Sequence, residues 1–280
     1  MSKIKIAFQG ELGAYSHIAC NEIFEGAEIK TCATFEETFK TAYEDESYRI
    51  IIPLENSLAG RVADIHYLLP KYKLQIHGEH FQRVEHNLIS KSEAEMKDIK
   101  FVRSHAQAIG QCQKIIMQEK YKTIISADTA GSAKDLADGK DKTIAAIASK
   151  LSAKIYKLKI LKENIEDEAG NVTRFLIMGK KVQQPEFNDK KKFITTCIFR
   201  LKSEPSALYK SLGGFATNQV NMTKLESFSV KNTFAQTNFY LDFEGHLDDK
   251  PVQNAMEELG FHTQSLDILG VYEASKFRQK

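Results

Sequence analysis

The sequence has no long apolar segment and no strong excess of charge of either sign. The N-terminus, MSKIKIAFQG, enters a strand pattern without the apolar core of a signal peptide, and no later segment has the length that a membrane span needs. Lys and Arg number 39 against 37 Asp and Glu, a net charge of +2, which gives no reason to expect binding to nucleic acid or to acidic membranes. We therefore expect a soluble cytoplasmic protein without nucleic-acid or membrane partners.

Several short motifs are also missing. The four cysteines include no C-x-x-C pair, which argues against a zinc ribbon or redox dithiol and for reduced thiols; they are Cys20, Cys32, Cys112 and Cys197. The segment HGEH, residues 77–80, has a spacing that suits a metal, but no second pair accompanies it, so we expect a surface or core role. No G-x-S-x-G elbow is present. We predict no metal site.

Strand and helix patterns alternate through most of the chain, whose 280 residues and 42% hydrophobic content allow one large or two ordinary domains. The predicted strands are 4–8, 28–33, 48–54, 100–105, 122–127, 143–149 and 171–180, and the predicted helices are 34–46, 106–119 and one that begins at Thr129. Such alternation is typical of α/β proteins with parallel strands. Two series of this kind predict two lobes with a cleft between them.

A different pattern begins near residue 182. Residues 182–191 have no apolar periodicity, include Pro185 and end in a lysine cluster, so we predict a linker there. Residues 192–280 then follow the order βαββαβ, the ferredoxin-like arrangement. The predicted domains are therefore 1–181 and 192–280. A small domain of this kind is more often regulatory or oligomerising than catalytic.

The segment GELGAYSH follows the first predicted strand and precedes a helix, an arrangement whose free backbone N–H groups favour an anion. The dinucleotide motif G-x-G-x-x-G needs three glycines, whereas only Gly10 and Gly13 are present and Glu11 would repel a pyrophosphate. A carboxylate ligand and a plain turn both remain possible from this pattern. SADTAGSA, residues 126–133, places hydroxyls at a similar junction.

Three further segments carry polar groups at the ends of predicted strands. In IIPLENSLAGRV, a ligand site explains three consecutive polar residues better than a helix N-cap does, because capping needs only one of them. In NVTRF, the pattern alone favours a solvated strand edge. In SHAQAIGQC, Ser104 or Gln107 can reach a cleft, while His105 fits a helix start.

Taken together and in this order, GELGAYSHIA, PLENSLAGRV, SHAQAIGQC, DTAGSA and NVTRF resemble the bacterial prephenate dehydratases, and the C-terminal part resembles the ACT domain that follows them. The resemblance covers essentially the whole chain. It implies a two-lobed catalytic domain of the type II periplasmic-binding-protein architecture, with prephenate bound between the lobes. It also implies a homodimer or homotetramer, feedback inhibition by L-phenylalanine at the ACT domains, and no metal or organic cofactor.

The resemblance implies a role for each candidate residue. Thr173 would contact the leaving hydroxyl as an oriented hydrogen-bond donor, and Glu55 would be the carboxyl group that supplies or relays a proton. Arg174 would pair with a substrate carboxylate or form a structural salt bridge. The implied substrate-binding residues are Gly13, Ala14, Tyr15, Ser16, Asn56, Ser57, Ser104, Gln107, Thr129, Ala130, Asn171, Arg174 and Phe175.

The implied phenylalanine site consists of Ser206, Ala207, Leu208, Asn218, Gln219, Val220, Asn221 and Met222. Several positions depart from the family pattern. Ser206 stands where glycine is usual, which puts sensitivity to phenylalanine in question; Ala106 replaces a frequent proline; and Arg61 replaces a small hydroxyl residue. The effector motif Glu-Ser-Arg-Pro is Glu-Ser-Phe-Ser at residues 226–229. Arogenate dehydratase and a non-catalytic amino-acid sensor are the alternatives.

Overall fold

The computed structural model describes residues 4–181, 183–230 and 236–279. Val182, where the predicted linker begins, lies outside the described residues, as do residues 231–235 and 280 of the predicted C-terminal domain. The four cysteines are buried and form no disulfide bond. Within the described part of the chain, no helix is both long and apolar enough to cross a membrane.

The chain divides into two compact units. The first comprises Met1–Thr38, Ile51–Val62 and His80–Phe175. The second comprises Phe39–Ile50, Ala63–Glu79 and Leu176–Lys280. Each unit is therefore assembled from segments that are distant in sequence, and the chain passes from one to the other several times.

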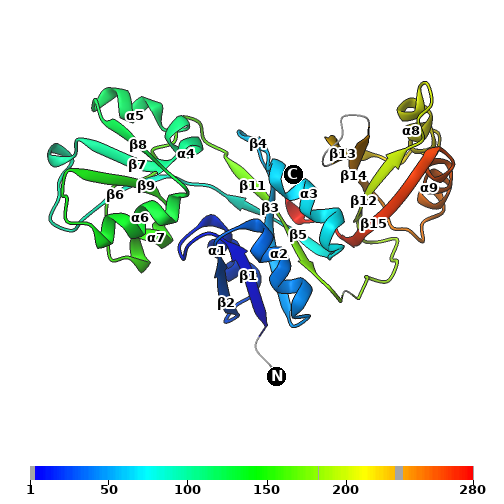
Figure 1. Cartoon of the computed structure of the whole chain (residues 1–280), viewed down its shortest axis with the longest axis horizontal. Coiled ribbons are helices and arrows are strands. Elements are labelled where there is room, and N and C mark those ends of the chain that lie inside the picture. The colour runs from blue at the N-terminus through cyan, green and yellow to red at the C-terminus, as the bar shows by residue number, and fades with distance from the viewer. Residues whose placement is uncertain (1–3, 182, 231–235, 280) are drawn as a thin grey trace. The chain divides into compact units, whose positions relative to one another are not determined.

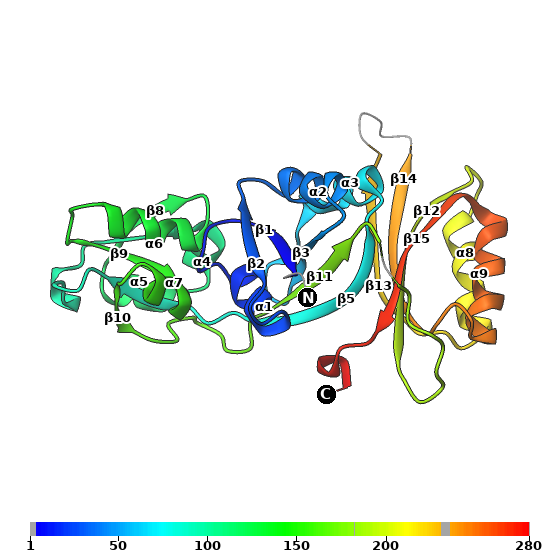
Figure 2. The same ribbon diagram turned by 90° about the horizontal axis from the view of Figure 1, so that it is seen from below.

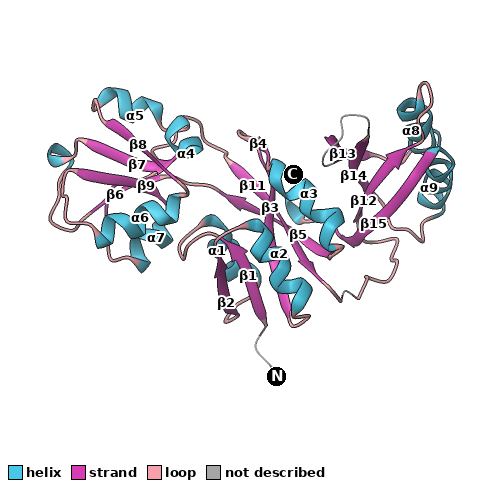
Figure 3. Cartoon of the chain, in the orientation of Figure 1, coloured by secondary structure: helices cyan, strands magenta, loops and turns pink. Residues whose placement is uncertain are grey.

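The first sheet has the order β2-β1-β3-β11-β5, with the short strand β4 paired to β3. Its strands are β1 (Lys5–Gln9), β2 (Glu28–Cys32), β3 (Tyr48–Asn56), β4 (Gly60–Arg61), β5 (Gln75–Arg83) and β11 (Val172–Gly179), and the helices of this part of the chain are α1 (Tyr15–Ile23), α2 (Phe35–Glu44) and α3 (Ala63–Tyr72). Strands β1 and β2 are parallel. The three central residues of β1 are completely buried, as a continuous apolar run predicts for a strand covered on both faces. Figure 3 shows this alternation of strands and helices.

The second sheet, in the first unit, has the order β10-β6-β9-β7-β8. Its elements are β6 (Asn87–Ser90), β7 (Phe101–His105), β8 (Lys122–Ser126), β9 (Ile144–Ala148), β10 (Lys159–Lys162), α4 (Ala106–Gly110), α5 (Gln113–Gln118), α6 (Thr129–Asp138), α7 (Lys150–Ile155) and the 3-10 turn η1 (Met96–Asp98). Alternate residues of β9 pack on opposite faces: Ala145 and Ile147 join the core that α4 and α5 contribute to, while Ala146 and Ala148 join that of α6 and α7. Figure 1 shows the two helix pairs on opposite sides of this sheet.

The third sheet, in the second unit, has the order β13-β14-β12-β15. Its elements are β12 (Phe193–Leu201), α8 (Ala207–Thr217), β13 (Met222–Ser229), β14 (Thr237–Glu244), α9 (Lys250–His262) and β15 (Thr263–Glu273), followed by the 3-10 turn η2 (Lys276–Gln279). This is the βαββαβ order predicted from the sequence. Cys197, Phe199, Leu241 and Phe243 face the core shared with the two helices, which Figure 2 shows side by side against one face of the sheet.

Two predictions about these elements are wrong. The sheets are mixed rather than purely parallel: β7 is parallel to β8 and β9, whereas β6 is antiparallel to both β9 and β10. The helix predicted over 106–119 is two helices, α4 and α5. The carboxylate of Asp167 accepts hydrogen bonds from the backbone N–H groups of Gln113 and Lys114 at 2.8 and 2.9 Å and so starts a new helix there.

Candidate active site

The GELGAYSH turn joins β1 to α1, and its glycines have φ of +114° at Gly10 and +96° at Gly13. Its first N–H groups have acceptors within the turn. The N–H of Gly13 donates to His17 Nδ1 at 3.0 Å, and that of Ala14 donates to the carbonyl of Glu11 at 3.1 Å. These two groups are therefore already used, contrary to the expectation that they would be offered to a ligand.

Gly13 also lies directly against the start of α7. Its carbonyl accepts hydrogen bonds from Ser149 Oγ at 2.6 Å and from Ser152 Oγ at 3.0 Å. A Cβ atom at this position would lie 2.5 Å from Ser152 Oγ, so glycine is required both by its φ and by the available space. Among the described residues, the backbone N–H groups of Tyr15 and Ser16 have no acceptor. Free N–H groups at a helix start favour an anion.

The Tyr15 side chain points into the protein. Its hydroxyl donates to the carbonyl of Glu85 at 2.7 Å and lies 3.0 Å from His86 Nδ1. Burial raises the pKa of Tyr15 well above its usual value, and the nearby Glu166 adds to the shift. The contribution of Tyr15 to a ligand would therefore come from its backbone.

Asn56, at the end of β3, has its side-chain orientation fixed by the turn that follows. Its Oδ1 accepts from the backbone N–H groups of Leu58 and Ala59 at 3.0 and 2.8 Å. An amide oxygen is an acceptor and the amide nitrogen is a donor, so Nδ2 must point the other way. It donates to Asn171 Oδ1 at 2.6 Å and to Thr173 Oγ1 at 2.9 Å.

Thr173 is placed by β11, which lies beside β3 in the first sheet. Because its Oγ1 accepts from Asn56, the hydroxyl proton points elsewhere, and among the described residues it has no acceptor. Thr173 is 9% exposed, so this donor is shielded from most of the solvent. The edge position expected from the NVTRF pattern alone is wrong, because β11 has neighbours on both sides.

Glu55 and Arg174 lie on the same two strands. Arg174 Nη1 is 3.3 Å from Glu55 Oε1, with the arginine side chain 3% exposed and the glutamate 33% exposed. Arg174 was expected either to pair with a substrate carboxylate or to form a structural salt bridge, and in this structure it forms the salt bridge. Arg61 of β4 is directly opposite Glu55 in the antiparallel pair with β3. Phe175 is buried in the core.

Two further side chains, His86 and Gln111, join this group and were not predicted. Asn171 Nδ2 donates to Gln111 Oε1 at 2.8 Å, and the same oxygen lies 2.9 Å from His86 Nε2. Gln111 sits in the break between α4 and α5, and His86 immediately precedes β6. The segment SHAQAIGQC includes Gln111. The prediction of one continuous helix over 106–119 gave no indication that Gln111 lies at a break between two helices. For His86 no signal in the sequence was evident.

The remaining predicted residues lie on β7, α4 and α6 and in the turn after β3. Ser57 Oγ accepts from the N–H of Val172 at 3.0 Å, which ties that turn to β11. Ser104 is completely buried and donates to the carbonyl of Ile147 at 2.7 Å, so it serves the sheet rather than a cleft. Gln107 is exposed at the start of α4.

Thr129 and Ala130 begin α6, where the N-cap Asp128 accepts from the N–H of Gly131 at 2.6 Å. The same helix carries Lys134, whose Nζ lies 3.0 Å from Glu11 Oε1. The start of α6 and the GELGAYSH turn therefore belong to neighbouring elements.

The predicted phenylalanine-site residues flank α8. Ser206 is its N-cap, with φ of +60° and no side-chain capping bond, and Gln219 just after the helix has φ of +58°. Asn218 Nδ2 donates to the carbonyl of Gly214 at 2.8 Å, and Asn218 Oδ1 accepts from Asn254 at 3.1 Å. Both ends of the Asn218 amide are thus engaged, the nitrogen within α8 and the oxygen in joining α8 to α9. The other members are the buried Ala207 and Val220 and the exposed Leu208, Asn221 and Met222.

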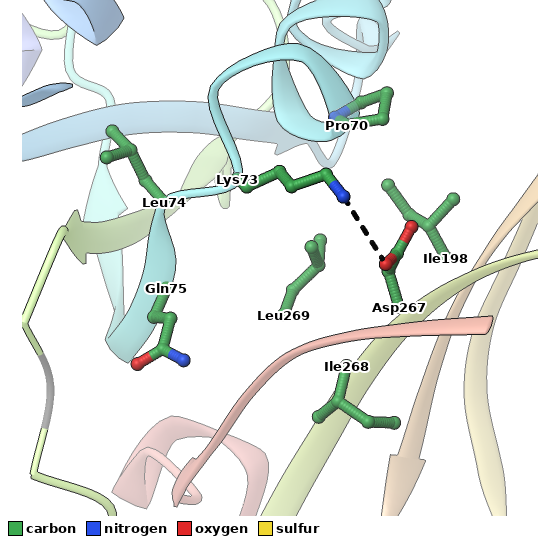
Figure 4. A pocket seen from close by; sticks show the side chains of 8 residues that line it. All are labelled: Pro70, Lys73, Leu74, Gln75, Ile198, Asp267, Ile268 and Leu269. Carbon is green, nitrogen blue, oxygen red and sulfur yellow. Dashed lines mark ion pairs between the residues drawn. The ribbon is translucent and has the colours of Figure 1, made fainter.

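A separate cavity of about 190 Å³ lies in the second unit (Figure 4). Of the described residues that line it, Lys73 is the one cation, and its ammonium group points toward Asp267 at 4.0 Å. The lining is otherwise mostly apolar; it consists of Pro70, Lys73, Leu74, Gln75, Ile198, Asp267, Ile268 and Leu269. Such a lining does not suit a dicarboxylate. Within the described ranges, no group of three or more His, Cys, Asp or Glu side chains is arranged to hold a metal.

Comparison with known proteins identifies the family. The family model for prephenate dehydratase matches residues 6–183, and the chain therefore belongs to the prephenate dehydratase family. The α/β fold with mixed sheets also matches a solved structure of prephenate dehydratase from Arthrobacter aurescens in complex with L-Phe. The two are 26% identical, with a TM-score of 0.87, over 99% of this chain and 92% of that one.

Two relatives show that the family includes different activities. The bifunctional N-acyl-homoserine lactone acylase/prephenate dehydratase of Komagataeibacter europaeus is 41% identical over 98% of each chain. Arogenate dehydratase/prephenate dehydratase 2 of Arabidopsis thaliana is 34% identical over 97% of this chain and 73% of its own length.

Proposed function

We propose that this chain catalyses the decarboxylating dehydration of prephenate to phenylpyruvate. The observation that carries the proposal is the environment of Thr173. Its Oγ1 accepts from Asn56 at 2.9 Å, and among the described residues its own proton has no acceptor. A shielded hydroxyl with an unused proton is suited to donate a hydrogen bond to a ligand oxygen.

The reaction needs such a donor. The bond between ring C1 and its carboxylate breaks to release carbon dioxide, and its electron pair moves through the ring to expel the C4 hydroxyl. Hydroxide is a poor leaving group, so one proton must be supplied for it to depart as water, and aromatisation provides the driving force. Thr173 would orient and polarise the leaving oxygen, since its hydroxyl is too weak an acid to give up a free proton.

Glu55 is the proposed source or relay of that proton. It lies on the strand next to Thr173, and its salt bridge with Arg174 at 3.3 Å holds the carboxyl group in position. Substrate carboxylates would bind to the free N–H groups of Tyr15 and Ser16 and to the start of α6 at Thr129 and Ala130.

The wider architecture is part of the same proposal. Residues 1–181 would form a two-lobed catalytic domain of the type II periplasmic-binding-protein kind, and residues 192–280 a ferredoxin-like ACT domain. L-phenylalanine would act as the feedback effector at the ACT domain of a cytoplasmic homodimer or homotetramer. The support is the βαββαβ order of β12 to β15 and the Arthrobacter relative described in complex with L-Phe.

The test is to incubate the purified protein separately with prephenate, arogenate and an N-acyl-homoserine lactone. The matched control is Thr173→Val, which keeps the shape of the side chain and removes its hydroxyl. We expect phenylpyruvate from prephenate with the native protein and little with the variant. Phenylalanine formed from arogenate at the higher kcat/KM would instead make the chain an arogenate dehydratase, an activity named for the Arabidopsis relative.

Release of a fatty acid from the lactone would show the second activity in the name of the Komagataeibacter relative. Absence of turnover with prephenate and arogenate, combined with tight binding of an amino acid, would favour the sensor alternative.

A further inference from the structure

We propose that Gln111 and His86 are positioning residues that fix the direction of the hydrogen bonds reaching Thr173. This inference rests on the proposed function for its consequence in catalysis, but the direction of the bonds can be tested without turnover. A chain of side-chain contacts, all within the first unit, leads from Thr173 to Asn56, Asn171, Gln111 and His86.

The donor and acceptor roles along the chain follow from one fixed end. The turn after β3 supplies two backbone N–H groups to Asn56 Oδ1, so Asn56 Nδ2 faces Asn171 and Thr173. Asn171 must then accept through Oδ1 and donate through Nδ2, and Gln111 must present Oε1 to it. Because an amide oxygen only accepts, the atom of His86 that faces Gln111 Oε1 must be a protonated Nε2.

At the other end, His86 Nδ1 meets the hydroxyl of Tyr15. With its proton on Nε2, a neutral His86 has a lone pair on Nδ1, which lies 3.0 Å from the Tyr15 hydroxyl and is a second acceptor beside the Glu85 carbonyl at 2.7 Å. Burial lowers the pKa of His86, which favours the neutral ring, while Gln111 and the carboxylate of Glu166 act in the opposite direction. Glu166 accepts from the backbone N–H of His86 at 3.0 Å.

The positioning matters because Asn171 is almost completely buried and its amide has two possible orientations. Without an acceptor at Gln111, Asn171 Nδ2 loses its partner, and rotation of the amide would turn that nitrogen toward Asn56 Nδ2. Two donors would then face each other, and Asn56 would shift away from Thr173. Displacement of a reacting group by about 1 Å lowers turnover on the order of 100-fold.

The experiment compares Gln111→Met with Gln111→Glu. Methionine has a similar size but no amide oxygen, whereas glutamate keeps an oxygen acceptor in the same place. We expect kcat to fall between roughly 10-fold and 100-fold in the methionine variant with little change in KM, and to be largely restored in the glutamate variant. The matched control is Gln113→Met on α5, whose side chain donates to the carbonyl of Ile109 at 2.7 Å outside this chain of contacts. It should leave kcat unchanged.

The second measurement is the tautomer of His86, read from the ¹⁵N chemical shifts of its ring. We expect the proton on Nε2 in the native protein. In Gln111→Met it should move to Nδ1, which can donate to the Tyr15 oxygen while Tyr15 donates to Glu85.

A native ring protonated on Nδ1 alone, or one whose tautomer does not respond to Gln111→Met, would overturn the proposal. The proposal would also be overturned if kcat and KM changed to the same extent in both Gln111 variants, because that result would indicate a merely structural role. If the native protein does not act on prephenate, the proposed function fails, and the bond directions are still decided by the tautomer.

Discussion

Removal of the Thr173 hydroxyl should separate catalysis from folding. Thr173→Val keeps the β-branched shape and deletes the oxygen that accepts from Asn56 at 2.9 Å. Asn56 Nδ2 keeps Asn171 Oδ1 at 2.6 Å for one of its two N–H groups; the other loses its acceptor, but the Asn56 side chain is only partly buried. The free energy of unfolding should therefore fall by only about 1 kcal/mol, the net worth of one hydrogen bond.

The effect on turnover should be much larger. Loss of a preorganised donor to charge that develops in the transition state costs on the order of 100- to 1000-fold in kcat, equivalent to about 3–4 kcal/mol. Thr173→Ser should retain part of the activity, because it keeps the hydroxyl and loses only the methyl group that restricts its rotamer.

The assay is formation of phenylpyruvate at saturating prephenate, with urea unfolding and phenylalanine calorimetry run on the same samples. We expect near-native unfolding midpoints and unchanged phenylalanine binding in both variants. Near-native kcat in Thr173→Val would refute the role assigned to the hydroxyl. A loss of kcat accompanied by a destabilisation of several kcal/mol would mean that the variant had disturbed the fold instead.

Three further outcomes are expected. Glu55→Gln should lower kcat more than it raises KM, whereas an effect on KM alone would mark Glu55 as a substrate-binding group. Gly13→Ala should lower the free energy of unfolding by about 3 kcal/mol, because its Cβ would lie 2.5 Å from Ser152 Oγ; Gly26→Ala, also at positive φ but with open space, should cost about 1 kcal/mol, and equal urea midpoints would contradict this reasoning. Ser206→Gly should tighten phenylalanine binding and sharpen inhibition together, because a backbone turn that approaches a ligand closely favours glycine and a side chain there costs contact. Calorimetry and turnover assays on both proteins test this, and absence of binding to either would argue for a purely oligomerising domain.

Most strands and helices were predictable because their signals are local. The run 143–149 is a short, almost entirely apolar segment, as expected for a buried strand, and β9 packs alternate residues against different helices. The helix from Thr129 was predicted from the hydroxyl-rich junction before it, and the structure supplies Asp128 as its cap. Patterns of period 2 and 3.6 contain the information for such elements within a few residues.

The break between α4 and α5 was not predictable in this way. Apolar residues continue at helical spacing across residues 106–119, and Gly110, where α4 ends, is a weak signal because a single glycine is tolerated inside a helix. The second helix starts where the N–H groups of Gln113 and Lys114 donate to the carboxylate of Asp167, and Asp167 lies more than fifty positions later in the chain. The direction of β6 was equally hidden, since a buried strand of four residues has the same composition whether its neighbours are parallel or antiparallel.

The candidate site, too, has parts that could be predicted from the sequence and parts that could not. The segments PLENSLAGRV and NVTRF could be singled out from their polar residues at strand ends. The pairing of Asn56 with Thr173 and of Glu55 with Arg174 depends on the order of β3 and β11 in the sheet, which the sequence does not state. Ser104 failed as a candidate for this reason, because its strand turns the hydroxyl toward the Ile147 carbonyl.

The chemistry of the groups around Thr173 also limits what each can do. Asn56, Asn171 and Gln111 are amides, which donate and accept hydrogen bonds but do not exchange protons readily, so the chain that they form can transmit orientation and cannot deliver the proton that the leaving hydroxyl needs. His86 lies at the far end of that chain, separated from Thr173 by three amides. The ionisable group on the strand beside Thr173 is Glu55, and its partner Arg174 is 3% exposed. Orientation and proton supply are therefore assigned to different side chains, which is why substitutions of Gln111 and of Glu55 should affect turnover through separate causes.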